Sequence, residues 1–257
     1  MQLEFVRYEK RNHIALVTIN RPEVMNALHP PANEELSRVW DDVAADPEVW
    51  VAILTGAGER AFSAGNDLKW TAQHGVPRMP KGGFGGLVAR DDLWKPLIAA
   101  VNGVALGGGL EIALACDVIV AAEHARLGLP EPRVGLMAAA GGVHRLPRHV
   151  PLKLAMGMIL TGRHVPAAEA ARIGLVNEVV SQAELMTVAE RWASEILECS
   201  PLAVQGSKQA ALQGLGRPLG EAMAAHYPLV QRLFTSEDVV EGPRAFAEKR
   251  KPVWKGR

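Results

Sequence analysis

The sequence of 257 residues predicts an α/β fold followed by an all-helical C-terminal appendage. Short apolar runs typical of buried strands alternate with segments whose apolar residues recur at helical spacing, which favours the α/β class. The clearest junction between the two patterns is Gly107-Gly108-Gly109, where a strand-like run ends and a helix-like run begins. Only helix-like segments follow residue 197. We therefore expect residues 1–196 to form the core and residues 197–257 the appendage.

The first elements can be placed in order along the chain. Residues 5–8 and 14–19 are rich in β-branched and aromatic side chains, which predicts an opening hairpin with a polar connection between its strands. Residues 30–45 carry apolar side chains at helical spacing, and Asp46-Pro47 ends that pattern. Residues 50–55 form a short apolar run typical of a buried strand.

The same arrangement repeats in the middle of the chain. Residues 96–101 predict a strand, Gly108 begins a helix, and residues 117–121 predict another strand. Residues 70–86, which include Pro77, have no apolar period, so we expect a long loop there. Long loops inside compact domains are usually functional or mobile.

The C-terminal part changes character from mixed to helical. Residues 166–173 predict a helix that ends at Gly174, and residues 175–180 predict a last strand. Residues 181–184 have the form of a capping box, which would open a helix running to residue 197. Three further helical stretches begin near residues 200, 217 and 236. Their apolar content is too small for an independent core, so we expect them to pack on the main domain or on a neighbouring subunit.

The composition is that of an ordinary globular protein, with 48% hydrophobic and 22% charged residues. Lys and Arg number 28, as do Asp and Glu, so the formal net charge of zero offers no footprint for nucleic acid or a membrane surface. Cys116 and Cys199 have neither metal-ligand spacing nor a disulfide framework, and the histidines lack ligand spacing too. We expect no metal, a reducing compartment and, without a signal-like or membrane-spanning run, a cytoplasmic location.

The glycine stretch before the helix at Gly108 is a candidate site. A helix N-terminus presents free N–H groups with positive dipole character, which suits an oxygen that gains negative charge. Glu111 follows within one turn, among apolar neighbours. A tight structural turn with Glu111 on a solvated face is the competing interpretation.

Two other stretches carry polar groups that could act with this one. Residues 62–68 form a second glycine-containing turn after a strand, with either free N–H groups or an ordinary cap at Asp67. Glu131 stands between Pro130 and Pro132, which hold its backbone rigidly. Two carboxylates in different environments can divide the work of acid and base.

Several common activities are excluded because their sequence motifs are absent or lack the required context. The run from Gly56 to Ala61 matches G-x-G-x-x-A, but residues 62–65 break the helix that a dinucleotide site needs, and residues 76–80 carry no acid. The chain also has no G-x-S-x-G, H-E-x-x-H, Walker or C-x-x-C motif.

The order of these motifs resembles the enoyl-CoA hydratase (crotonase) superfamily over nearly the whole chain. Within it, the loop glycines Gly82-Gly83 and the closing run 236–257 are most similar to the carnitinyl-CoA dehydratases (crotonobetainyl-CoA hydratases). The resemblance rests on Asn20-Arg21-Pro22, Asn26-Ala27-Leu28, Ala64-Gly65-x-Asp67, Asn102-Gly103, Gly107-Gly108-Gly109-x-Glu111, Pro130-Glu131, Gly141-Gly142, Thr161-Gly162, Gly174-Leu175-Val176 and Phe246-Ala247-Glu248.

This resemblance implies a reaction and residues for it. The family fold is a spiral of ββα units, and its members hold an acyl-CoA thioester carbonyl with two backbone N–H groups, for which Ala64 and Gly108 are the matching positions. The hydratases have glutamates at the positions of Glu111 and Glu131. By analogy, Glu111 would activate the water that adds at C3, and Glu131 would exchange the proton at C2.

The resemblance also implies how the substrate and subunits are arranged. Coenzyme A would be carried by the substrate, with no separate cofactor, and the C-terminal appendage would join subunits into a trimer or a dimer of trimers. Phe246 and Lys249 would reach the nucleotide end of coenzyme A, often in an adjacent subunit. The rest of the coenzyme would lie along Val24, Ala27, Ser63, Asn66, Asp67 and Leu68.

Some positions depart from the family pattern and leave alternatives open. Residues 138–142 replace a common P-G-A-G-G run, and Trp70 adds bulk after the second turn, either as loop packing or facing a cationic acyl group. Reversible hydration is the leading interpretation. Isomerisation or other enolate chemistry is the second, and an acyl-CoA binder without turnover is the third.

Overall fold

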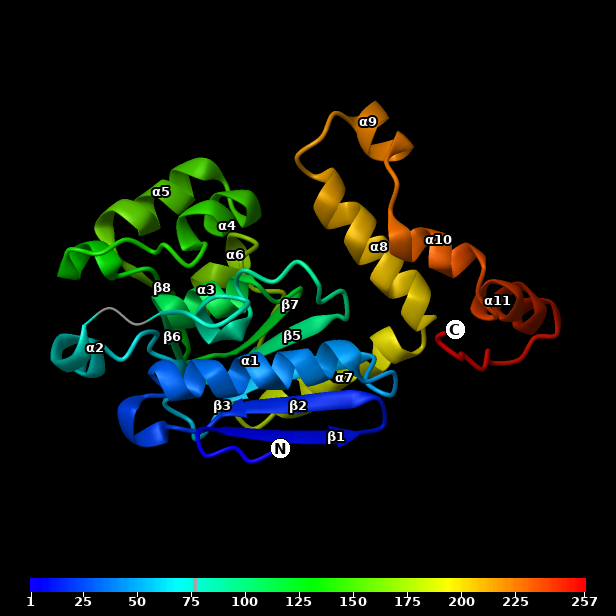
Figure 1. Cartoon of the computed structure of the whole chain (residues 1–257). Coiled ribbons are helices and arrows are strands. Elements are labelled where there is room, and N and C mark those ends of the chain that lie inside the picture. The colour runs from blue at the N-terminus through cyan, green and yellow to red at the C-terminus, as the bar shows by residue number, and fades with distance from the viewer. Residues whose placement is uncertain (76–77) are drawn as a thin grey trace.

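A computed structural model describes residues 1–75 and 78–257; of the predicted loop, Val76 and Pro77 lie outside the described residues. Figure 1 shows a body of two sheets covered by helices, with a helical tail projecting from it. The elements in chain order are β1 (Val6–Arg11), β2 (Ile14–Ile19), α1 (Pro30–Ala45), β3 (Val51–Gly56), β4 (Ala61–Ser63), α2 (Leu68–His74), β5 (Leu97–Val101), β6 (Val104–Leu106), α3 (Gly108–Leu114), β7 (Val118–Ala122), β8 (Arg126–Gly128), α4 (Gly142–His149), α5 (Leu152–Thr161), β9 (His164–Pro166), α6 (Ala167–Arg172), β10 (Glu178–Val180), α7 (Leu185–Leu197), α8 (Pro201–Gly214), α9 (Leu219–Ala224), α10 (Pro228–Phe234) and α11 (Asp238–Ala247).

From β3 to β8, successive strands alternate between the two sheets. The first sheet has the order β1-β2-β3-β5-β7-β10, and the second has the order β4-β6-β8-β9. The β2–β3, β3–β5, β5–β7 and β7–β10 pairs are parallel, as are β4–β6 and β6–β8. The chain therefore winds as a spiral of strand-strand-helix units, which confirms the α/β class and the predicted ββα spiral.

The six-stranded sheet is buried on both faces. Every residue of β3 and β5 is buried, which explains why these strands are continuous apolar runs. On one face, the main core includes Trp40 of α1; on the other, a smaller cluster includes Leu185 and Ala189 of α7. This layered packing places the ends of β4 and β6 near the start of α3.

The opening hairpin is tighter than predicted. The β1 strand continues through Glu9, Lys10 and Arg11, and only Asn12 and His13 form the turn, with φ of 48° and 64°. A two-residue turn with two positive φ values matches the twist of an antiparallel pair. The polar residues that suggested a longer connection occupy an edge strand whose side chains are largely exposed.

The predicted loop over residues 70–86 is partly helical. Asp67 caps α2 by accepting a hydrogen bond from the Trp70 backbone N–H at 3.1 Å. Residues 84–86 then form a single 3₁₀ turn. The prediction of an irregular loop from residue 70 was therefore wrong at its start, because one capped helical turn is too short to show an apolar period.

The C-terminal elements match the predicted helical character with differences at their ends. The α7 helix begins at Leu185, and the Ser181 hydroxyl contacts the Glu184 carboxylate rather than a backbone N–H, so the predicted capping box was wrong. The last strand is confined to residues 178–180, and the tail has four helices where three were predicted. Within residues 1–75 and 78–257, no helix combines the length and apolar character needed to cross a bilayer.

Candidate active site

The start of α3 lies at the centre of the candidate site. Gly107 precedes the helix with φ of 53°, and its N–H donates to the Gly128 carbonyl at 2.9 Å. The N–H groups of the first helical turn point out of the helix without internal partners. Among the described residues, the Gly108 N–H has no acceptor. The sequence predicted that N–H groups at this helix start could stabilise an anion, and the Gly108 N–H is free to accept that role.

The turn after β4 packs directly against this helix start. A Cβ atom on Gly109 would come within 2.0 Å of the Ser63 carbonyl oxygen, and one on Gly65 would come within 2.8 Å of the Gly108 nitrogen. Glycine is therefore required at both positions for the two backbones to approach this closely. The contact brings the two predicted glycine turns together.

The hydrogen bonds of the second turn change one assignment. The Ala64 N–H, predicted as an oxyanion donor, donates to the Met25 carbonyl at 2.9 Å and is therefore occupied. Asn66 forms a parallel bridge to Leu28 through the bonds of its neighbours, so its own N–H faces the other way. In the part of the chain that the structure describes, the Asn66 N–H has no acceptor. The available donor beside Gly108 is Asn66, two residues after the predicted one.

Glu111 is buried rather than solvated. It is 3% exposed, and one carboxylate oxygen accepts a hydrogen bond from the Gly142 N–H at 2.8 Å. Burial raises the pKa of Glu111 to about 7, and the charge of Glu131 adds to this, whereas the Gly142 N–H and the Arg145 charge oppose it. The interpretation of Glu111 as a surface residue is wrong, because its helix face is covered by α4.

Glu131 approaches the same helix start from the other side. It opens the 3₁₀ turn Glu131–Val134, and a Cβ atom on Gly107 would meet its carboxylate at 3.0 Å. One oxygen of Glu131 is buried without a hydrogen-bond partner among the described residues. Burial raises the pKa of Glu131 as well. An unpaired buried carboxyl oxygen is costly unless a bound molecule completes its hydrogen bonding.

Most of the predicted coenzyme-binding residues lie beside the second turn. The Leu28 N–H donates to the Gly65 carbonyl at 2.7 Å, which places the segment containing Val24 and Ala27 next to residues 63–68. Ser63 is buried, with its hydroxyl bonded to the Asn26 carbonyl, while Leu68 is exposed. Arg21 pairs with Asp67 at 3.1 Å and also donates to the Ala27 carbonyl, so it joins the two segments.

Two predicted residues are not brought to this site within one chain. Phe246 lies near the end of α11 and is 88% exposed, and Lys249 follows it. Figure 1 shows α11 at the end of the tail, on the opposite side of the molecule from α2.

Trp70 takes part in local packing. Its ring stacks on His74, one turn later in α2, with ring centroids 4.6 Å apart. One face of the indole is therefore occupied by a neighbour in the same helix. His144 of α4 is exposed.

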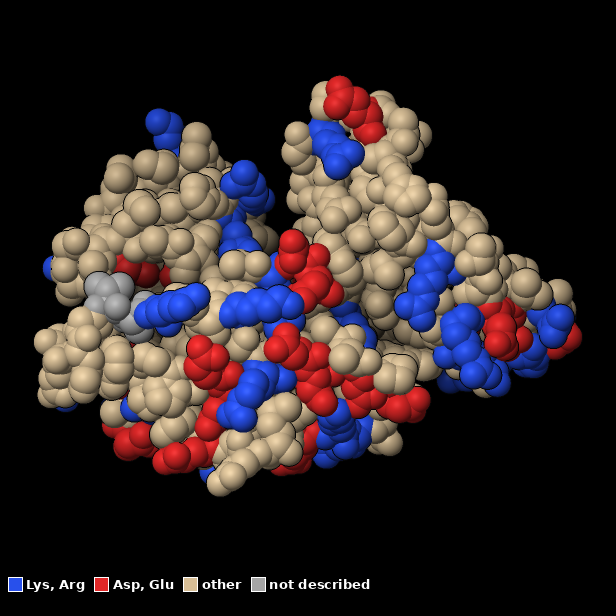
Figure 2. All heavy atoms as spheres, viewed as in Figure 1, with Lys and Arg blue, Asp and Glu red and all other residues tan. Residues whose placement is uncertain are grey.

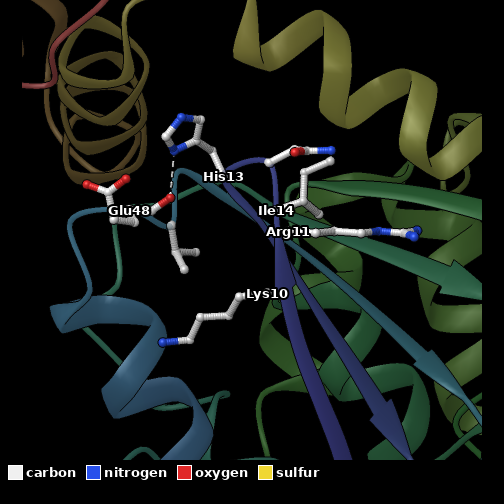
Figure 3. A pocket seen from close by; sticks show the side chains of 7 residues that line it. Lys10, Arg11, His13, Ile14 and Glu48 are labelled. Atoms are coloured by element: carbon white, nitrogen blue, oxygen red, sulfur yellow. Dashed lines mark hydrogen bonds between the residues drawn. The ribbon is translucent and has the colours of Figure 1, made fainter.

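A separate surface pocket lies at the turn between β1 and β2. It is lined by residues that include Lys10, Arg11, His13 and Glu48, and the His13 ring bonds to the Glu48 carbonyl at 2.8 Å (Figure 3). Lys10 pairs with Asp42 and Asp46, and Arg11 pairs with Glu190, so these charges are already compensated. None of the candidate site residues lines this pocket.

The family follows from comparison with known proteins. The sequence profile described as enoyl-CoA hydratase/isomerase matches residues 9–257. The chain belongs to this family. It is 42% identical to (E)-benzylidenesuccinyl-CoA hydratase of Thauera aromatica over 262 residues, covering 98% of this chain and 99% of the relative.

Further relatives agree with this placement in the enoyl-CoA hydratase/isomerase family. Carnitinyl-CoA dehydratase of Escherichia coli is 44% identical over 263 residues, covering 99% of both chains. The crystal structure of an enoyl-CoA hydratase from Mycobacterium tuberculosis has a TM-score of 0.93 and 40% identity, covering 98% of this chain and 99% of that one. The predicted resemblance to the crotonase superfamily, including its similarity to carnitinyl-CoA dehydratases, is therefore confirmed.

Proposed function

We propose that this enzyme catalyses the reversible addition of water to a short-chain enoyl-CoA thioester. One observation carries the proposal: the buried Glu111 and the partly buried Glu131 flank a helix start whose Gly108 N–H packs against the turn that contains Asn66. Free N–H groups serve the oxygen that becomes negative, and paired carboxylates serve the water and the proton.

The proposed mechanism assigns each group one task. The thioester carbonyl accepts hydrogen bonds from the N–H groups of Gly108 and Asn66, which stabilise the enolate form. Glu111, as a carboxylate, takes a proton from water while the hydroxide portion bonds to C3. Glu131 supplies the proton that bonds to C2, so the elements of one water molecule are added across the double bond.

The surrounding residues would hold the coenzyme portion of the substrate. Val24, Ala27, Ser63, Asn66, Asp67 and Leu68 belong to two segments that the Leu28–Gly65 hydrogen bond and the Arg21–Asp67 ion pair hold together next to the proposed oxyanion site. Phe246 and Lys249 would come from a neighbouring subunit, in a trimer or a dimer of trimers. The reaction needs no separate cofactor or metal, and we place the enzyme in the cytoplasm.

The acyl group is best addressed by an assay panel. The similar relatives are named for an aromatic acyl-CoA and for a cationic one. Hydration should therefore be measured with crotonyl-, crotonobetainyl-, (E)-benzylidenesuccinyl- and longer enoyl-CoAs, with the products identified. A 3-hydroxyacyl product supports hydration, a shifted double bond would instead show isomerisation, and binding without turnover would show an inactive acyl-CoA binder.

Glu111→Gln and Glu131→Gln test the proposed acid and base. Each change preserves the shape of the side chain but removes its ability to exchange a proton, so we expect hydration of the best substrate to fall by roughly 100-fold to 10,000-fold. The measurement is kcat on the preferred enoyl-CoA, with calorimetry to show that the thioester still binds. Unchanged turnover in either variant would remove that residue from the mechanism.

A further inference from the structure

Arg145 is a half-buried arginine next to the site, and the proposed chemistry gives it no role. It lies in α4, three residues after Gly142, whose N–H holds the Glu111 carboxylate at 2.8 Å. One nitrogen of its guanidinium donates to the Val88 carbonyl at 2.7 Å. Burial lowers the pKa of Arg145, but an arginine keeps its charge at any physiological pH.

The guanidinium and the Glu111 carboxylate lie against consecutive backbone positions. A Cβ atom on Gly141 would come within 2.2 Å of the Arg145 guanidinium, and one on Gly142 would come within 3.0 Å of the Glu111 carboxylate. The backbone N–H of Arg145 also donates to the Gly141 carbonyl at 2.7 Å. The side chain therefore folds back over Gly141, the residue that precedes its own helix, and fixes the turn that contacts Glu111.

The segment that Arg145 contacts belongs to the opposite wall of the site. Val88 follows Phe84, whose ring occupies the space where a Cβ atom on Gly108 would lie, at 2.4 Å. Arg90 anchors this segment to α1 through the Gly86 and Ser37 carbonyls. Arg145 therefore connects α4, whose Gly142 N–H bonds to Glu111, to the segment whose Phe84 ring packs against Gly108.

We propose that Arg145 is a positioning residue for Glu111, which it serves by fixing the first turn of α4 against residues 84–88 and by placing a permanent positive charge near the carboxylate. The inference rests on the proposed function and deepens it. The other charged or titratable groups in this region are Glu131, which faces Glu111, and Cys116 and His149, which face Arg145. Neither Cys116 nor His149 gives a stable positive charge, because burial raises the pKa of the Cys116 thiol to about 12 and lowers the pKa of His149.

Arg145→Gln and the matched control Arg148→Gln test this role. Arg148 lies on the same helix, is exposed, and bonds to the His144 carbonyl. The pKa of Glu111 is followed by infrared titration of the protonated carboxyl band that disappears in Glu111→Gln. We expect the midpoint to rise by about one pH unit in Arg145→Gln, because a nearby opposite charge is lost, and to remain unchanged in Arg148→Gln.

The kinetic constants should distinguish Arg145→Gln from Arg148→Gln in the same way as the infrared titration. In Arg145→Gln, kcat at neutral pH should fall about 100-fold with little change in KM, because a misplaced base slows the chemical step more than binding. The pH dependence of kcat should move upward with the infrared midpoint. An unmoved midpoint in folded Arg145→Gln overturns the charge role, and a change confined to KM or to the melting temperature overturns the positioning role.

Arg145→Lys provides a second variant that is expected to fold if the glutamine variant does not. Lysine keeps the positive charge but lacks the planar guanidinium that contacts both Gly141 and Val88. We therefore expect an unchanged midpoint for the Glu111 titration and a kcat about tenfold lower. Wild-type kcat in this variant would overturn the bridging role. Because the infrared titration needs no substrate, it decides the inference even if wild-type enzyme fails to hydrate any enoyl-CoA, which would refute only the proposed function.

Discussion

Glu111 is a carboxyl group whose ordinary charged state is opposed by its surroundings. Glu111 is 3% exposed, and the hydrogen bond from the Gly142 N–H does not compensate fully for the loss of water. The pKa of Glu111 rises to about 7 in the folded protein, whereas in the unfolded chain it lies near 4.5. The folded state therefore binds this proton more tightly than the unfolded state.

This difference predicts a pH-dependent effect of Glu111→Gln on stability. A raised folded pKa contributes stability that is fully present below the unfolded pKa and is lost as the pH rises through the folded pKa. The variant does not titrate, so its free energy of unfolding relative to wild type should increase by about 2 kcal/mol between about pH 5 and pH 8. Urea unfolding of both proteins at the two pH values measures this. A constant difference would mean that Glu111 is charged and well solvated.

At the residue scale, the sequence indicates the candidate acids more directly than the candidate backbone donors. Glu111 and Glu131 could be named because carboxylates beside glycines or prolines are visible as letters. The donor at the second turn could not, since every residue there has an N–H and only the fold shows which one is used. Ala64 bonds to Met25, and that contact depends on how residues 24–28 pack against the turn.

At the scale of elements, the contact between the start of α3 and the end of β4 carries the site. Gly109→Ala should destabilise the protein by roughly 3 kcal/mol, because the new methyl group would meet the Ser63 carbonyl at 2.0 Å and neither backbone can move freely. Thermal unfolding measures the loss, and kcat should fall with it because the Gly108 donor is displaced.

Gly157→Ala is the matched control for this change. Gly157 lies within α5, and a Cβ atom there would meet nothing within 4 Å. Alanine is the better helix former, so this variant should be stabilised by about 0.5–1 kcal/mol with unchanged activity. Equal effects of the two substitutions would show that α3 and β4 are not in close contact.

The predictability of the elements followed their length. The buried strands β3, β5 and β7 and the helix α1 have runs long enough to show a pattern, and all four were predicted within one residue at each end. The second sheet was not visible from the residues alone, because β4, β6, β8 and β9 have three residues each. Their pairing is set by the winding of the chain, and only the family resemblance implied it.

At the scale of the whole molecule, the tail projects from the body and carries exposed apolar side chains. Figure 2 shows a notch between the tail and the body, and basic and acidic residues interspersed over the face in view. Leu215, Leu219 and Met223 are each at least 75% exposed. Apolar surface of this kind is typical of an interface, in agreement with the proposed assembly of subunits.

A charged substitution on this surface tests the assembly. Leu219→Glu combined with Met223→Glu should shift the protein to a smaller species in analytical ultracentrifugation, because burying two carboxylates in an apolar interface is unfavourable. Glu34→Gln, on the exposed face of α1, is a control that should not change the mass. An unchanged mass for the double variant would place the interface elsewhere.

Hydrogen bonds also hold the C-terminal residues against the helices of the tail. The Asp238 carboxylate, which is 2% exposed, accepts hydrogen bonds from the Ser200 hydroxyl at 2.8 Å and from the Lys255 N–H at 2.7 Å. Asp238→Ala should therefore leave these donors unpaired and release residues 253–257, which limited proteolysis with mass spectrometry would detect as faster C-terminal cleavage. Glu221→Gln, on the exposed surface of α9 and away from residues 253–257, should be cleaved at the wild-type rate.

The burial of Glu111 also determines how the enzyme molecules divide between the protonated and the ionised form of this residue. In the proposed mechanism, hydration starts from the enzyme form that lacks the Glu111 proton, and dehydration starts from the form that holds it. With a pKa of about 7, both forms are populated in neutral solution. A carboxyl group with an ordinary pKa would be almost entirely ionised in neutral solution, so only the form from which hydration starts would be populated. The proposed mechanism therefore has both protonation states of Glu111 available in neutral solution, and the concentrations of the two thioesters determine the net flow.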